Sequence, residues 1–490
     1  MSGVQRRLYS AAQVREIEHR AIEKLRVPGL QLMRRAAAAA WGDLRISWPK
    51  ARVIGVVCGP GNNGGDGYEL ARLAKAARRE VRVWQLGVPP NSGDALTTCK
   101  GWLKAGGKIV PWSTTISFDD CDVLVDALFG IGLSRPLEGA ALAAVHVINA
   151  ATTAKLALDI PSGLNADTGA AMGACVRADR TATFIGYKSG LFQGAAADAV
   201  GRLQLYTLDL PAKAYTGTDH DAELLDGGEL KDALPRRRRA AHKGDHGHVL
   251  VMGGDHGMMG AALLAGRAAL RAGAGLVSVA TRQAHVAAMT GAQPELMCRG
   301  VEDAREIGPM LEAATVIALG PGLGQTNWGR ALFAQALSAK KPLVVDADGL
   351  NWLAQNPMRR EDWVLTPHPG EASRLLDTDT LRIQADRFAA AQSLQERYGG
   401  IVALKGAGTV ICDGNLSVCP HGNPGMAVGG MGDVLAGVIA ALLAQGLTAA
   451  QATQAGVLAH ALAGDEAARA GERGLLPSDL LPLLRKYLNP

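Results

Sequence analysis

The sequence lacks the marks of several large protein classes. Its seven cysteines, at positions 58, 99, 121, 175, 298, 412 and 419, are scattered and form no C-x-x-C pair, so we expect neither a zinc site nor a disulfide framework. The first ten residues contain no apolar run, and the longest apolar stretch, Val434–Leu443, is too short to span a bilayer. The formal net charge is only +5 over 490 residues, so nothing demands a nucleic-acid or membrane partner. These absences predict a soluble protein of the cytoplasm.

Glycine, by contrast, is abundant. The 61 glycines gather in short loops rather than in a repeat, which is typical of tight turns and of backbone that approaches a ligand closely. Apolar, β-branched runs such as Arg52–Cys58 alternate with Ala-rich helical patterns such as Tyr68–Ala77, and this alternation predicts parallel sheets covered by helices on both faces. Two such series flank the polar stretch Pro211–Pro235. We therefore expect two α/β domains, at residues 1–217 and 221–490.

The first glycine-rich motif lies at Cys58–Tyr68, which reads CGPGNNGGDGY between a strand pattern and a helix pattern. Its five glycines permit positive φ angles and let backbone N–H groups converge at a helix start, so the motif predicts a phosphate-binding loop. No Gly-Lys-Ser/Thr follows, so the motif is not a Walker loop. The alternative is a tight turn without a ligand.

Two more polar strand ends are expected beside this motif. Asp126 precedes the loop LFGIGLSRP and Asp159 precedes IPSG, and ligands of open α/β sheets bind outside the carboxyl ends of strands. Asn63, Asp126 and Ser162 offer only oxygen ligands, a set that suits an alkali or alkaline-earth cation better than zinc. Each aspartate alone has the alternative role of a turn cap.

These motifs resemble those of YjeF-type NAD(P)H-hydrate epimerases, a Rossmann-like family that interconverts the R and S forms of cofactors hydrated at the nicotinamide ring. The resemblance implies a three-layer α/β/α domain, K⁺ bound by Asn63, Asp126 and Ser162, and Asp159 as the acid–base residue. It implies substrate contacts by Asn62, Asn63, Gly64, Gly65, Asp66, Gly130, Ile131, Gly132, Leu133, Ser134, Arg135, Pro136 and Asp159.

The second glycine-rich motif, Asn423–Gly437, reads NPGMAVGGMGDVLAG and leads into an apolar helical stripe. The helix start is expected near Gly429–Asp433, where free amides can hold a transferring phosphoryl group. A carboxylate there would repel phosphate unless it had another purpose, so we interpret Asp433 as the base that deprotonates an attacking hydroxyl. Simple capping of the helix is the alternative. Asp346 and Asp348 could hold Mg²⁺ through oxygens, although a turn role fits them equally.

The second half resembles the ribokinase-like domain of the same family, the ADP-dependent (S)-NAD(P)H-hydrate dehydratases, through HKGDHGHVLVMGG, MMGAALLAG, TPHPGE and the second glycine-rich motif. The resemblance implies a second α/β/α domain that uses ADP with Mg²⁺. It implies substrate contacts at Ala261, Gly324, His368 and Asp433, and nucleotide contacts at Lys405, Gly406, Ala407, Gly408, Thr409 and Gly432.

Together the two resemblances predict a bifunctional repair enzyme whose partners are NADHX, NADPHX and ADP, and which forms a homo-oligomer. Phosphorylation would turn the ring hydroxyl into a good leaving group, and NAD(P)H, AMP and phosphate would be the products. A small-molecule kinase with a stable phosphorylated product is one alternative, and a catalytically idle N-terminal scaffold is another. The arginine run Arg236–Arg239 is open to two readings, a solvated turn or a contact with a phosphate-rich ligand.

Overall fold

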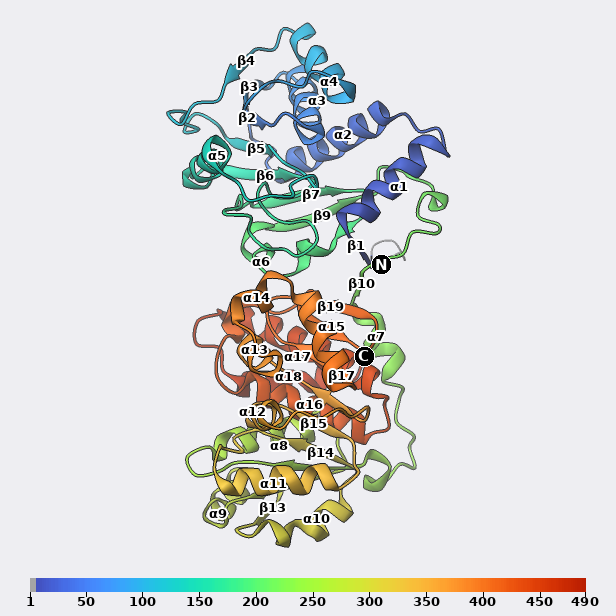
Figure 1. The fold of residues 1–490 in the computed structure, drawn as a ribbon, viewed down its shortest axis with the longest axis vertical. Helices are drawn as coiled ribbons and strands as arrows, with labels where there is room; N and C mark the ends of the chain where they lie inside the picture. The colour runs from blue at the N-terminus through green and yellow to red at the C-terminus, as the bar shows by residue number, and fades with distance from the viewer. Residues whose placement is uncertain (1–5) are drawn as a thin grey trace. The chain divides into compact units, whose positions relative to one another are not determined.

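A computed structural model describes residues 6–490 of the chain. The chain divides into two compact units, Met1–Glu223 and Leu224–Pro490 (Figure 1). Each unit has its own hydrophobic core. Each contains a largely parallel sheet with helices, which confirms the predicted α/β class. Among the described residues, no helix is long and apolar enough to cross a membrane.

The first unit is built on a seven-stranded parallel sheet in the order β4-β3-β2-β5-β6-β7-β9. The strands are β2 (Val53–Cys58), β3 (Glu80–Gln85), β4 (Ile109–Pro111), β5 (Val123–Ala127), β6 (Ala154–Leu158), β7 (Arg180–Phe184) and β9 (Arg202–Tyr206). The chain adds β3 and β4 on one side of β2 and the later strands on the other side. This reversal of strand order opens a crevice at the carboxyl ends of β2 and β5.

Side chains of β2 alternate between two helical layers, as the pleat of a strand requires. Val56 and Cys58 belong to the core formed with α1 to α4, whereas Val57 belongs to the core formed with α5. The helices are α1 (Ala11–Glu23), α2 (Gly29–Ser47), α3 (Asn62–Ala76), α4 (Gly93–Lys104), α5 (Gly139–Ala150) and α6 (Ala196–Ala199). The short strand β1 (Arg7–Tyr9) pairs in parallel with β8 (Tyr187–Lys188) and antiparallel with β10 (Ala222–Leu224).

The sheet of the second unit runs in the order β13-β12-β11-β14-β15-β16-β17-β18-β19, parallel as far as β17 and antiparallel from there on. The strands are β11 (His248–Met252), β12 (Leu276–Thr281), β13 (Met297–Gly300), β14 (Val316–Leu319), β15 (Leu343–Val345), β16 (Trp363–Leu365), β17 (Ile401–Leu404), β18 (Thr409–Cys412) and β19 (Leu416–Cys419).

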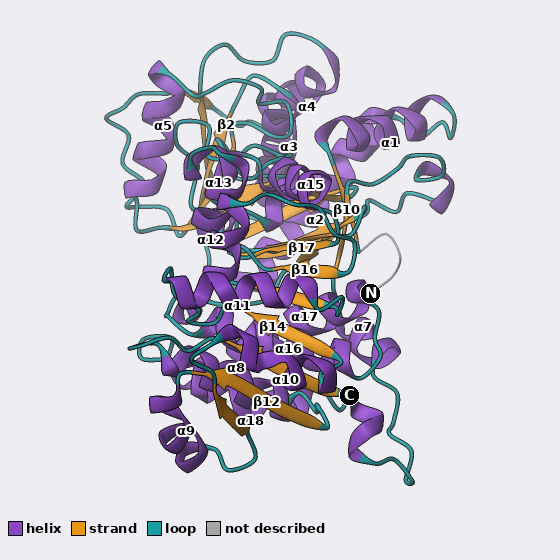
Figure 2. Cartoon of the chain, turned by 60° about the horizontal axis from the view of Figure 1, so that its bottom comes forward, coloured by secondary structure: helices purple, strands orange, loops and turns teal. Residues whose placement is uncertain are grey.

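Apolar helices α8, α16, α17 and α18 share one core with the strands of this sheet, while α11 and α12 lie over its other face (Figure 2). The helices are α7 (Gly227–Ala233), α8 (Met259–Arg271), α9 (Val286–Ala292), α10 (Gly308–Ala313), α11 (Asn327–Ser338), α12 (Asp348–Gln355), α13 (Pro369–Leu376), α14 (Thr380–Ala385), α15 (Arg387–Tyr398), α16 (Met431–Ala444), α17 (Ala449–Ala467) and α18 (Pro477–Tyr487).

Three features differ from or extend the sequence expectations. Helix α3 begins at Asn62 rather than near Tyr68, so the first glycine-rich motif is the start of a helix and not a loop before it. The edge strands β4 and β13 were not predicted, because their partly exposed residues form no apolar run.

Arg236–Arg239 is fully on the surface, and Arg237 donates hydrogen bonds to Gly273 O and Gln445 Oε1, both at 2.6 Å. The run is thus a solvated segment that contacts two turns of its own unit.

Candidate active sites

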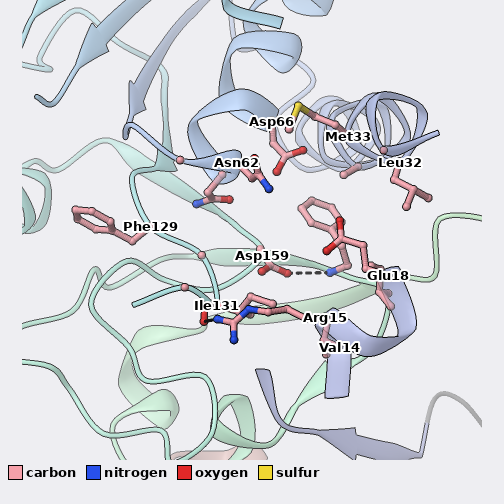
Figure 3. Close-up of a pocket in the computed structure, with 18 of the residues that line it drawn as sticks. Val14, Arg15, Glu18, Leu32, Met33, Asn62, Asp66, Phe129, Ile131 and Asp159 are labelled. Carbon is pink, nitrogen blue, oxygen red and sulfur yellow. Dashed lines mark hydrogen bonds between the residues drawn. The ribbon is translucent and has the colours of Figure 1, made fainter. Parts of the chain in front are cut away.

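The first unit contains a cavity of about 720 Å³ at the carboxyl ends of β2, β5 and β6 (Figure 3). It brings together most of the residues expected to bind the substrate, namely Asn62, Asn63, Asp66, Gly130, Ile131, Gly132, Leu133, Ser134, Arg135 and Asp159. Gly64, Gly65 and Pro136 do not line it. The cavity lies where the strand order reverses, as expected for a ligand site of an open α/β sheet.

The glycines of the first motif serve close packing. None of Gly59, Gly61, Gly64, Gly65 and Gly67 has a positive φ, so the expectation that they supply left-handed turns was wrong. A Cβ at Gly59 would lie 1.9 Å from Leu128 O, and one at Gly64 would lie 2.0 Å from Gly59 O. The absence of side chains therefore lets the first turn of α3 lie directly against the ends of β2 and β5.

Asp159 follows β6 with a φ of +64°, a left-handed conformation that a short polar residue tolerates. Its Oδ1 atom accepts hydrogen bonds from Lys188 Nζ and, at 3.3 Å, from Phe184 N. Lys188 is completely buried, and its ammonium also donates to Thr183 Oγ1 at 2.9 Å and to Phe184 O at 2.8 Å. A buried ammonium needs such partners, so Lys188 holds the Asp159 carboxylate in place. Sequence reasoning missed this lysine, whose only signal is a charged residue a few positions after the buried strand β7.

Asp126, at the end of β5, is fully buried. Its carboxylate accepts hydrogen bonds from Ser162 Oγ at 2.6 Å, Ser162 N at 2.8 Å and Leu128 N at 3.2 Å. Burial raises the pKa of Asp126 to about 6. The buried side-chain atoms Nδ2 and Oδ1 of Asn63 have no hydrogen-bond partner. A buried carboxyl group and an unpartnered amide oxygen together fit a bound cation, since buried polar atoms otherwise find a partner.

The loop that follows β5 lies beside Ser162, Asn63 and Asp159. Phe129 N donates to Ser162 Oγ at 2.9 Å. A Cβ at the neighbouring Gly130 would lie 3.4 Å from Asp159 Oδ2 and 3.6 Å from the Cβ of Asn63. The oxygen set expected for K⁺ and the expected acid–base residue therefore both adjoin one segment, residues 129–130.

A second cluster lies at the carboxyl ends of β15, β16 and β17 in the other unit. Asp346 Oδ1 accepts hydrogen bonds from Lys405 Nζ at 2.5 Å and from Thr366 Oγ1 at 2.8 Å. Lys405 Nζ also lies 3.7 Å from Glu371 Oε2. A Cβ at Gly432 would lie 3.2 Å from both Asp346 Oδ2 and Lys405 Nζ. The first turn of α16 thus adjoins a partly buried lysine and two buried carboxyl groups.

Asp433 occupies that first turn, and the alternative role of helix cap does not apply to it. The capping residue of α16 is Gly430, with a φ of +99° and no side-chain hydrogen bond. Burial, and next the negative charge of Asp346, raise the pKa of Asp433 to about 7, and the cation of Lys405 opposes the rise. A carboxyl group whose pKa lies near neutral pH can act as a general base.

Asp346 and Asp348 have separate partners. The Asp348 carboxylate accepts hydrogen bonds from Gly324 N at 2.8 Å and Gln325 Nε2 at 3.1 Å, whereas Asp346 is paired with Lys405. Asp348 therefore holds the loop that carries Gly324, which corresponds to the turn role rather than to a shared metal pair.

The other expected substrate contacts lie on neighbouring loops and helix starts. His368 caps α13, and its Nδ1 atom accepts from Gly370 N at 3.0 Å while its backbone N–H donates to Glu371 Oε2 at 2.7 Å. This exchange links His368 to the carboxyl group beside Lys405. Ala261 lies in the first turn of α8, and a Cβ at Gly322 would lie 3.2 Å from the Cβ of Ala261. The loop with Gly322 and Gly324 thus meets α8.

The backbone carbonyl groups of the expected nucleotide loop, Lys405–Thr409, accept hydrogen bonds from Arg387, a residue that sequence reasoning missed. Arg387 is 1% exposed, and its Nη2 donates to Leu404 O at 3.0 Å and to the carbonyl oxygens of Lys405 and Gly408, both at 3.3 Å. Gly406, with a φ of +146°, passes over the guanidinium, since a Cβ there would lie 2.8 Å from Nη1. Occupying these carbonyl groups fixes the shape of the loop.

Comparison with known proteins agrees with this division into two sites. Residues 249–486 match the family described as NAD(P)H-hydrate dehydratase, and residues 29–190 match the YjeF-related protein N-terminus. The chain is 47% identical over 487 residues to a bifunctional NAD(P)H-hydrate repair enzyme of Coxiella burnetii, with 99% of both chains covered. It is 43% identical to the enzyme of that name from Escherichia coli, with 99% of this chain and 94% of the other covered. A ribokinase-like superfamily protein from Enterococcus faecalis is similar in structure, with a TM-score of 0.51 and 29% identity over 54% of this chain and 95% of that one.

Proposed function

The chain belongs to the family of bifunctional NAD(P)H-hydrate repair enzymes, and we propose that the cavity of its first unit is the epimerase site and that the cluster around Asp433 is the dehydratase site. The enzyme combines an NAD(P)H-hydrate epimerase with an NAD(P)H-hydrate dehydratase. The roles of individual residues are our assignments. The observation that carries them is that each unit brings motif residues, a lysine and carboxyl groups together at the carboxyl ends of its strands.

In the epimerase site, the nicotinamide end of the hydrate is assigned to the part of the cavity between Asp159 and α3. Asp159 moves a proton on the oxygen bound to the carbon that bears the hydroxyl, because its carboxylate faces the cavity and is held by Lys188. Asn62 and Asp66, near the start of α3, contact the substrate from the opposite wall.

A potassium ion in this unit would be held by Asn63, Asp126 and Ser162. The supporting observation is the buried Asn63 side chain without a partner beside the buried carboxyl group of Asp126. The ion would supply a fixed positive charge that keeps Asp126 ionised and orients the loop at residues 129–130.

Replacing K⁺ in the buffer by the bulky tetramethylammonium ion should therefore lower the epimerase rate and the melting temperature of the first unit. D126N should remove the dependence on K⁺, because it removes the only charged ligand of the proposed set. An epimerase rate that is equal in both salts would contradict the assignment.

In the dehydratase site, Asp433 accepts the proton of the ring hydroxyl as that oxygen attacks the β-phosphorus of ADP. The new O–P bond replaces the bond to the bridging oxygen, and AMP leaves. The backbone amides at the start of α16 and the ammonium of Lys405 face the charge that develops on the phosphoryl oxygens. The lone pair of the ring nitrogen then expels phosphate, and loss of a proton from the adjacent ring carbon restores NAD(P)H.

Magnesium bound with ADP would find its oxygen ligands at Asp346 and Glu371. Both carboxyl groups are buried next to Lys405, and burial, opposed by the charge of Lys405, raises the pKa of Glu371. A divalent cation would neutralise this excess of carboxyl groups and offset charge on the phosphates. ADP as the phosphoryl donor, a place in the cytoplasm and assembly into a homo-oligomer likewise stay predictions.

The test uses the purified R and S hydrates with ADP and Mg²⁺, and follows the return of dihydronicotinamide absorbance. The wild type should repair both hydrates, D159N only the S form, and D433N neither, although D433N should still interconvert R and S. Accumulation of a stable phosphorylated hydrate would instead indicate a kinase. Unchanged R-to-S conversion in D159N would indicate that Asp159 is not the acid–base residue.

A further inference from the structure

Helix α1 forms one wall of the epimerase cavity, although it precedes the segment 29–190 that matches the family. The residues of α1 that line the cavity share one face of the helix and are Val14, Arg15, Glu18, His19 and Ile22. Arg15 Nη2 donates to Ile131 O at 2.9 Å, which joins the helix to the expected substrate loop. The site therefore includes an element that carries none of the recognised motifs.

Glu18 places a further carboxyl group at the reaction centre. Figure 3 shows its side chain reaching from α1 into the cavity, next to the hydrogen bond between Asp159 and Lys188. Asp66 enters the same cavity from α3. Burial, and next the negative charge of Asp159, raise the pKa of both Glu18 and Asp66, while the ammonium of Lys188, which is paired with Asp159, opposes the rise. Burial and like charges therefore favour the protonated form in part of this set.

The surroundings of Glu18 determine which form it prefers. Burial is the largest influence and raises its pKa; the negative charges of Asp159 and Asp94 act in the same direction, while Lys188 and Arg15 oppose them. The carboxyl group of Glu18 thus holds its proton more tightly than an exposed glutamate, next to a carboxylate that is ion-paired.

Epimerisation by loss and return of water needs both a proton donor and a proton acceptor. The C–O bond of the hydroxyl breaks as the ring nitrogen lone pair forms a C=N bond, and the departing oxygen must gain a proton. A water molecule then adds to the opposite face of the ring and must lose a proton. One carboxylate cannot do both from one position.

We propose that Glu18 is a second catalytic residue of the epimerase site, which protonates the departing hydroxyl while Asp159 accepts the proton of the water that adds. This inference rests on the proposed function of the cavity. After one R-to-S conversion, Glu18 has lost a proton and Asp159 has gained one. Water in the cavity then returns a proton from Asp159 to Glu18.

The test compares E18Q with the wild type in the full-length protein. Glutamine keeps the size and hydrogen bonding of the acid but has no proton to give, so kcat for R-to-S conversion should fall by about 10²- to 10⁴-fold with KM nearly unchanged. E23Q is the matched control, because Glu23 is exposed on the same helix and does not line the cavity. Repair of the S hydrate, which uses the other unit, should be unchanged in both variants.

The pH profile adds a readout that a purely structural role would not change. The wild-type rate should fall at high pH as Glu18 loses its proton, and E18D should keep a weakened form of this decline. Loss of S-hydrate repair in E18Q would indicate that the substitution disturbs folding, and E18D would then replace it in the comparison. A wild-type kcat and pH profile in E18D would overturn the proposal. So would an unchanged kcat in E18Q, or a rise in KM alone. A full loss in D66N together with a wild-type rate in E18Q would assign the donor to Asp66. A wild-type protein without epimerase activity would instead refute the proposed function itself.

Discussion

Replacing Asp433 by asparagine should impair the dehydratase and stabilise the second unit at the same time. Burial, and next the negative charge of Asp346, raise the pKa of this carboxyl group from the ordinary 3.8 to about 7. The active base is the ionised form, so the wild-type rate should rise with pH and level off above about 7. Removing a general base costs about 10²- to 10⁴-fold in rate, and D433N should lose that much at pH 8.

The stability change follows from the same shift. A raised pKa in the folded state contributes stability that is fully present below the unfolded pKa of 3.8 and is lost as the pH rises through about 7. Each pKa unit corresponds to about 1.4 kcal/mol, so ionising Asp433 destabilises the unit by up to about 4 kcal/mol at pH 8. Neighbouring carboxyl groups share this penalty, which makes the figure an upper limit. Asparagine resembles the protonated acid and carries no such penalty.

Thermal unfolding at pH 4 and pH 8 measures the effect. We expect D433N and the wild type to melt alike at pH 4 and D433N to melt several degrees higher at pH 8. D377N is the matched control, because Asp377 is an exposed aspartate of the same unit, and its rate and melting temperature should equal those of the wild type. Equal melting temperatures of D433N and wild type at pH 8, or a dehydratase rate within a few-fold of wild type, would refute the assignment.

Two further substitutions test the packing and the charges of the sites. K405M leaves the carboxylates of Asp346 and Glu371 without their cation, so the free energy of unfolding of the second unit should fall by about 3–5 kcal/mol. The KM for ADP should rise, and the rise of the dehydratase rate with pH should occur at higher pH. An unchanged pH profile would contradict the placement of Lys405 beside Asp433. G64A puts a methyl group 2.0 Å from Gly59 O and should destabilise the first unit by about 2 kcal/mol or more with loss of epimerase activity. G61A adds a Cβ that meets nothing within 4 Å and should leave the stability of the first unit unchanged. Equal stability of G64A and G61A would show that the close approach of Gly64 to Gly59 is unimportant.

Local sequence patterns were enough to predict the fold class and the position of both motifs. Alternating apolar runs and helical patterns reflect contacts that each element makes with the sheet beside it, so they can be recognised locally. Asp159 and Asp433 could be predicted as candidates for the same reason, since each lies at the end of a strand or the start of a helix within a glycine-rich context.

The role of the glycines in the first motif and the surroundings of the two aspartates depend on packing between distant segments. The first turn of α3 is helical because Gly59 and Gly64 allow backbone to meet backbone, and composition alone does not distinguish this from a flexible loop. Lys188 pairs with a residue 29 positions away, and Lys405 with one 59 positions away. Such ion pairs exist because the strand order brings distant strand ends together, and no local pattern in the chain records that order.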